Sequence, residues 1–227
     1  HCAARQQALL ESTASMLEVP EALVEEAIQA ELAAENLVQE MTEDEPLVYL
    51  PAIYRSETGV TRHLLRLRQG APAWGVIDPQ QAIPWVEQRT GLHLSPSQRE
   101  AVATAIKSKV VVITGGPGVG KTAVVNSILR IIRAKGAQVR LCAPTGRAAK
   151  RLTESTGLEA RTVHRLLEFD PQSMGFKHDS HDPLQMDLLV VDEVSMMDVV
   201  LMNQLLRALP DYSALMLVGD VDQLPSV

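Results

Sequence analysis

The sequence predicts an α/β protein in which a parallel sheet forms the larger, carboxyl-terminal part and a small α+β domain precedes it. Two observations carry this prediction. Short aliphatic runs recur after residue 95 without polar alternation, as in strands that are buried on both faces. Helical patterns separate at least the first three runs, which is typical of a parallel sheet covered by helices. The runs are 110–114, 139–143, 188–191 and 215–219.

The amino-terminal part has a different pattern. Residues 6–32 show helical apolar spacing that is broken at Pro20, which predicts two helices. Residues 37–50 predict two short strands around an acidic turn. Two helices followed by a hairpin are typical of a small winged-helix-like unit.

A connecting segment follows this unit. Residues 53–67 predict an amphipathic helix, and the prolines and glycines of 69–94 predict a linker. We therefore place a boundary near Pro84. The expected domains are 1–84 and 85–227.

Charge is distributed unevenly along the chain. Residues 6–54 contain eleven acidic residues and no lysine or arginine, in a chain of net charge −7. This segment repels a polyanion, so we expect it to be a packing module or to bind a protein partner, rather than to act as a DNA-binding wing. Any nucleic-acid contact is expected in the remainder of the chain.

Other features restrict where the protein works. No apolar run approaches the roughly 18 residues of a membrane-spanning helix, so we expect no membrane association. Cys2 and Cys142 are too few for a disulfide framework, which favours a reducing, intracellular compartment. The chain begins with His1 and not with methionine, so we expect it to be part of a longer protein.

Residues 115–122, GGPGVGKT, fit the phosphate-binding pattern G-x-x-x-x-G-K-[ST], with a predicted strand before them and a helix after them. Glycines let the backbone turn its N–H groups inward, where they and the helix start favour an anion. Lys121 can reach the β- and γ-phosphates, and the Thr122 hydroxyl can bind Mg²⁺. A chance glycine turn or a dinucleotide-binding turn explains the lysine and the spacing less well. The expected nucleotide-binding residues here are Gly116, Pro117, Gly118, Val119, Gly120, Lys121, Thr122 and Ala123.

Two acidic residues follow the predicted strand 188–191. Asp192 comes directly after the strand, at the end where parallel sheets bind ligands, and is expected to hold Mg²⁺. Glu193 is expected to orient or deprotonate the attacking water. The alternative is a solvated acidic strand end. Beside a phosphate-binding loop, the pair favours nucleotide hydrolysis.

Several further strings carry a family resemblance. Together with the phosphate-binding loop they resemble motifs of superfamily 1 DNA helicases of the RecD/TraA type, over roughly residues 92–227. The resemblance implies a RecA-like P-loop NTPase domain that uses ATP and Mg²⁺ and contacts single-stranded DNA. It also implies a bacterial cytoplasmic parent protein that moves 5′ to 3′ and serves DNA recombination or repair. The strings are LSPSQREAV (94–102), APTGRAAKRL (143–152), TVHRLL (162–167), VVDEVSMMD (190–198) and VGDVDQLPSV (218–227).

The resemblance also implies roles for single residues. Gln98 is expected to read adenine, because a side-chain amide can donate and accept at once. Gln223 is expected to sense the γ-phosphate and to act in catalysis with Lys121 and Glu193. Contacts to the single strand are expected from Pro144, Thr145, Gly146, Arg147 and His164.

The resemblance finally bears on how active the chain is. Motors of this class close the nucleotide site with a second RecA-like domain, whose arginine finger can be worth about 10³ or more in turnover. The chain ends at Val227, so we expect it to bind nucleotide, to hydrolyse it slowly and not to unwind DNA. Two alternatives stay open: an AAA-type ATPase that remodels protein, and a non-catalytic module that binds nucleotide or a partner.

Overall fold

The computed structural model describes residues 2–116 and 118–220. The chain divides into two compact units, His1–Thr61 and Arg62–Val227. Residues 62–84, which the sequence placed with the amino-terminal domain, belong to the second unit. The reason is packing, because Trp74, Ile77 and Ile83 are buried in the core of that unit.

The first unit contains the two helices and the hairpin that the sequence predicts. Helices α1 (Gln6–Leu17) and α2 (Glu21–Ala33) pack through a small core, and Pro20 precedes the second helix as expected. Its sheet is antiparallel, in the order β1-β3-β2, and includes a two-residue strand that the sequence did not indicate. The strands are β1 (Ala4–Arg5), β2 (Val38–Met41) and β3 (Pro46–Tyr49).

Two helices occupy the predicted connecting segment. Helix α3 (Pro51–Leu67) agrees with the predicted amphipathic helix. The predicted linker contains α4 (Pro79–Thr90), which differs from the prediction. Asp78 caps its start by accepting from Gln80 N at 3.0 Å, and Gly91, at φ 67°, ends it. Proline content therefore misled the prediction, because good caps and a buried face outweigh one interior proline.

The second unit is built on a five-stranded sheet in which all neighbouring strands are parallel. The strand order is β4-β10-β9-β5-β6. The four predicted strands are confirmed, and the fourth begins one residue earlier than expected. The short edge strand β6 was not predicted. The strands are β4 (Val110–Thr114), β5 (Val139–Ala143), β6 (Ala160–Thr162), β9 (Leu188–Val191) and β10 (Ala214–Gly219).

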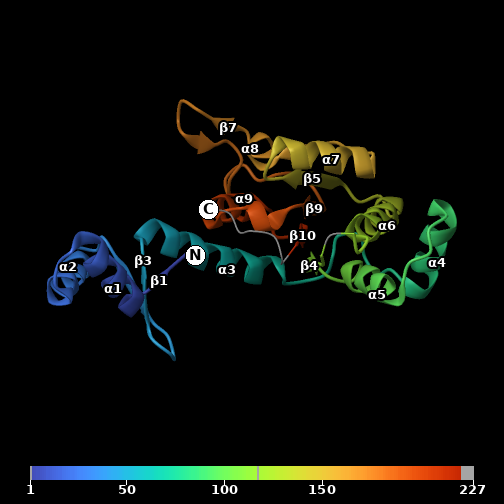
Figure 1. Ribbon diagram of the computed structural model, residues 1–227. Coiled ribbons are helices and arrows are strands. Elements are labelled where there is room, and N and C mark those ends of the chain that lie inside the picture. The colour runs from blue at the N-terminus through green and yellow to red at the C-terminus, as the bar shows by residue number, and fades with distance from the viewer. Residues whose placement is uncertain (1, 117, 221–227) are drawn as a thin grey trace. The chain divides into compact units, whose positions relative to one another are not determined.

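Helices cover this sheet, and Figure 1 shows α4 and α5 (Pro96–Ala105) packed against α6 (Lys121–Ala134). On α6, residues Val124, Ile128 and Ile132 are spaced one helical turn apart and point into the core. None of the helices in the described segments is both long and apolar enough to cross a bilayer. The remaining elements are α7 (Gly146–Thr156), α8 (Val163–Leu166), the hairpin β7 (Phe169–Asp170) and β8 (Gly175–Phe176), the 3₁₀ turn η1 (Val194–Met196) and α9 (Val199–Arg207).

Candidate nucleotide-binding and hydrolysis site

The predicted phosphate-binding and acidic residues follow strands that end at one edge of the parallel sheet. Strand β4 leads into the phosphate-binding loop at Gly115, β9 leads into Asp192, and β10 leads into Asp220. Parallel strands place their carboxyl ends together, which is where open α/β sheets bind ligands. Topology therefore brings residues far apart in the sequence to one site.

Glycine conformation shapes the loop. Gly118 and Gly120 have φ values of 77° and 86°, which L side chains rarely adopt. A Cβ on Gly115 would lie 2.8 Å from the Val119 Cγ2 atom, so the loop closes tightly there. Helix α6 begins at Lys121, directly after a glycine. The first N–H groups of such a helix, together with its dipole, favour phosphate.

The ammonium of Lys121 lies over this loop. It donates to the carbonyl oxygen of Gly115 and to that of Gly116, the second at 3.0 Å. The buried Asp220 carboxylate lies 3.8 Å from the same nitrogen. Lys121 is thus held by oxygen atoms of the site that phosphate oxygens can replace.

Asp192 and Glu193 stand beside this lysine. Burial raises the pKa of Asp192, and the negative charge of Glu193 acts in the same direction. When the surroundings disfavour the negative charge of a carboxylate, a bound cation stabilises the charged form. Glu193 adopts a left-handed backbone at φ 53°, a strained conformation for a non-glycine residue, and its Oε1 atom accepts from Arg151 Nη2 at 2.9 Å.

Lys121, Thr122, Asp192 and Glu193 line one cavity of about 300 Å³. Oxygen ligands from a carboxylate and a hydroxyl suit Mg²⁺, and Thr122 and Asp192 supply both kinds here. The donor set therefore fits the metal. Residues that line this space, and that the sequence did not single out for the site, come mainly from α7 and the strands. The lining residues are Lys121, Thr122, Val125, Arg151, Leu152, Ser155, Thr156, Val190, Asp192, Glu193 and Val218.

Gln98 lies against the phosphate-binding loop. Its Oε1 accepts from Ser95 N at 3.0 Å, and Ser95 Oγ accepts from Gln98 N at 3.3 Å, so the two residues form a capping box at the start of α5. Its Nε2 donates to the carbonyl of Val119 at 3.1 Å. The structure thus brings Gln98 to the loop, and adenine reading stays a prediction.

A second contact, which the sequence did not indicate, fixes α5. Glu87 on α4 accepts from Arg99 through both carboxylate oxygens, at 3.1 and 2.6 Å, and from Leu94 N at 2.8 Å. The N–H of Leu94 is the main cause that holds the pKa of Glu87 below its usual value. Because Arg99 follows Gln98 directly, this pair orients the helix that carries Gln98.

Most of the predicted DNA-contacting residues lie at the same edge of the sheet. Thr145 joins β5 to α7, and its Oγ1 accepts from Ala148 N at 3.2 Å, which caps the helix. Pro144 and Gly146 flank it, and Arg147 in the first turn of α7 is exposed.

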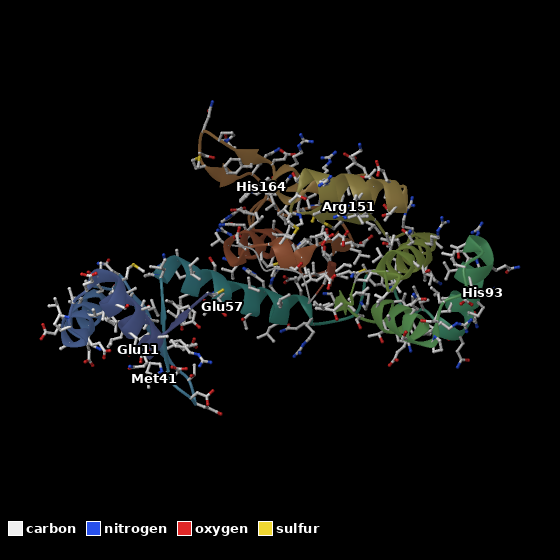
Figure 2. The ribbon with its side chains drawn as sticks, in the orientation of Figure 1. Glu11, Met41, Glu57, His93, Arg151 and His164 are labelled. Atoms are coloured by element: carbon white, nitrogen blue, oxygen red, sulfur yellow. The ribbon has the colours of Figure 1, made fainter. Side chains whose placement is uncertain are left out.

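His164 lies just beyond the end of β6, the strand next to β5 (Figure 2). Its ring centroid is 5.9 Å from that of Phe169 and 5.7 Å from that of Phe176. The sequence did not indicate this aromatic cluster, because its members come from α8 and the β7–β8 hairpin. Pro117 and Gln223, two further predicted site residues, lie outside the described residues.

Cys142 lies beside this edge of the sheet. It belongs to β5, and its carbonyl accepts from Asp192 N at 2.9 Å. Cys142 is fully buried, and burial strongly raises the pKa of its thiol. It is a packing residue next to the site.

The fold and the site define a P-loop nucleotide-binding domain. The chain belongs to the family described as AAA domain, which matches residues 98–227. The match covers the described loop, the acidic pair and the β5–α7 junction.

Comparison with individual proteins confirms the resemblance to RecD-like helicases. The ATP-dependent RecD2 DNA helicase of Deinococcus radiodurans is 41% identical over 214 residues, which are 88% of this chain and 29% of that protein. The RecBCD enzyme subunit RecD of Haemophilus influenzae is 40% identical over 154 residues, 57% of this chain and 24% of the relative. The match to the crystal structure of Pif1 helicase from Candida albicans covers 60% of this chain and 34% of the Pif1 chain, at 26% identity and a TM-score of 0.47. The chain thus spans less than a third of these two curated relatives.

Proposed function

We propose that this chain is the first RecA-like motor domain, with its preceding segment, of an ATP-dependent DNA helicase. One observation carries the proposal. Lys121, Thr122, Asp192 and Glu193 line a single cavity at the carboxyl edge of the sheet. A cation for phosphate, two oxygen ligands for Mg²⁺ and a carboxylate for water are the parts that nucleotide hydrolysis needs.

The residues divide this work between them. Lys121 and the amides of the loop bind the phosphates. Thr122 and Asp192 would hold Mg²⁺, which when bound would neutralise charge on the phosphates. Glu193 orients the attacking water and accepts its proton. Gln98 reads adenine, and Gln223 senses the γ-phosphate.

The nucleic-acid partner in this proposal is single-stranded DNA. The exposed Arg147 and the neighbouring start of α7 offer donors to phosphate at the edge where the nucleotide is proposed to bind. The names of the relatives support DNA unwinding by the full-length protein. Movement from 5′ to 3′, a role in recombination or repair, a cytoplasmic location and a protein partner for the acidic first unit belong to the same proposal.

The first test is nucleotide binding by this chain, measured by calorimetry with Mg²⁺-ATP. Lys121→Ala removes a charged donor, worth about 1.5–3 kcal/mol, and should weaken binding by about 10- to 150-fold. Binding that survives this change unaltered would contradict the phosphate-binding role.

The second test compares hydrolysis by the full-length protein with and without single-stranded DNA. Stimulation by DNA supports the motor. Brisk hydrolysis that DNA leaves unchanged favours instead the AAA-type ATPase that remodels protein.

A further inference from the structure

Arg151 connects the helix proposed to contact DNA with the carboxylate proposed to activate water. Arg151 lies on α7 (Figure 2). It follows Arg147 by four residues, so the two arginines are about one helical turn apart on one side of the helix. Its Nη2 donates to Glu193 Oε1 at 2.9 Å.

The two partners differ in exposure. The Arg151 side chain is 64% exposed, whereas that of Glu193 is 18% exposed. A guanidinium has five N–H donors, so an exposed one can exchange a carboxylate for a phosphate. A DNA phosphate bound at the start of α7 would lie about one turn from Arg151. The same guanidinium can therefore serve either anion.

The backbone of Glu193 is fixed by other contacts. The turn that follows it packs closely on β10, where a Cβ on Gly219 would lie 2.8 Å from Val194 Cγ1. Asp192 N, just before it, is bound to the Cys142 carbonyl. Loss of Arg151 should thus release the Glu193 side chain and leave its backbone in place.

We propose that Arg151 is a positioning residue that holds the Glu193 carboxylate away from the attacking water until single-stranded DNA draws the guanidinium onto a phosphate. A carboxylate that accepts from a guanidinium is less available to a water proton. This inference rests on the proposed function. The inference adds to the proposed function a route by which DNA binding raises the rate of hydrolysis.

Hydrolysis by the full-length protein gives the first test. An exposed ion pair supplies an effect of about two- to fivefold, so Arg151→Ala should raise kcat without DNA by that factor and leave KM for ATP unchanged. The rate with saturating oligodeoxythymidine should change little, so the stimulation factor falls. Arg151→Lys keeps the charge but loses the planar fork, and should give an intermediate rate.

Lys150→Ala is the matched control. It removes the same charge from the same helix, but Lys150 pairs with Glu154 at 3.9 Å. Its rate without DNA should equal that of wild type. An unchanged or lower rate in Arg151→Ala, or an equal rise in Lys150→Ala, overturns the inference. Wild-type protein without DNA-stimulated hydrolysis overturns the proposed function as well.

DNA binding gives a second test that needs no turnover and can be made on this chain. If Glu193 and DNA compete for Arg151, Glu193→Gln should tighten oligodeoxythymidine binding by about two- to fivefold, by thermodynamic reciprocity. The gain should vanish in the Arg151→Ala background. Glu154→Gln removes a negative charge from the same region without touching Arg151, and sets the general charge effect. A gain no larger than that of Glu154→Gln, or one that persists without Arg151, refutes the competition.

Discussion

Alanine substitution of two loop glycines tests how Gln98 braces the phosphate-binding loop. Gly118 and Gly120 have similar φ values of 77° and 86°. A Cβ on Gly118 would meet nothing within 4 Å, whereas one on Gly120 would lie 2.4 Å from Gln98 Nε2. The two changes therefore share one backbone cost and differ in one contact.

The structure sets the size of the difference. Each alanine pays for a left-handed backbone, about 1 kcal/mol after the smaller entropy of the unfolded chain is counted. Because the amide of Gln98 ends a flexible side chain, it can swing away from a Cβ at Gly120, and what is lost is its hydrogen bond to the Val119 carbonyl. That loss adds about 1 kcal/mol. We expect Gly118→Ala to destabilise by about 1 kcal/mol and Gly120→Ala by about 2 kcal/mol.

Urea unfolding followed by tryptophan fluorescence measures both values. The chain has two tryptophans, Trp74 and Trp85, and both belong to the second unit, so the signal reports the unit that contains the loop. In a Gln98→Ala background the extra cost of Gly120→Ala should disappear. Equal destabilisation by the two alanines in the wild-type background would refute the bracing role.

Three further predictions concern titrating groups. Asp192→Asn should abolish the Mg²⁺-dependent part of ATP affinity, measured by calorimetry. Because burial raises the pKa of Asp192, the Mg²⁺ affinity of the wild type should begin to fall at a higher pH than it would with an ordinary aspartate, and the variant should lack this pH dependence. Glu87→Gln should lower Tm at neutral pH and progressively less as pH falls through the lowered pKa of Glu87, because the Leu94 N–H is the main group that lowers this pKa and the stabilisation is lost when the carboxylate is protonated. A Tm difference that persists in acid would contradict this reasoning. Burial and a hydrogen bond to Glu40 raise the pKa of Tyr49 to about 12. The neutral phenol therefore stabilises the fold at any pH below the ordinary pKa of tyrosine, and this stabilisation is lost as pH rises through about 12. An absorbance titration should show a late phenolate step that Tyr49→Phe lacks.

The sheet and the phosphate-binding loop could be predicted because their signals are local. Continuous aliphatic runs indicate strands buried on both faces, and β9 and β10 are buried along their whole length. The GGPGVGKT spacing fixes the loop between a strand and a helix. Parallel topology then places Asp192 at the same edge without further information.

Other parts of the site depend on contacts that the sequence does not encode locally. Arg151 and Glu193 pair across 42 residues, because β5 and β9 are neighbours in the sheet. Their pairing follows from strand order and cannot be predicted from spacing. Helix α4 was hidden by its interior Pro84, whose cost is offset by the buried Ile83 and Val86.

The closed position of Cys142 has a practical consequence for spectroscopy. The chain carries two thiols, and the partly exposed Cys2 is the other one. Since maleimide dyes react with accessible thiolates, the native chain should take up one fluorophore, at its amino-terminal end, without any cysteine being replaced. A dye there leaves the nucleotide-binding residues chemically intact while ATP is titrated.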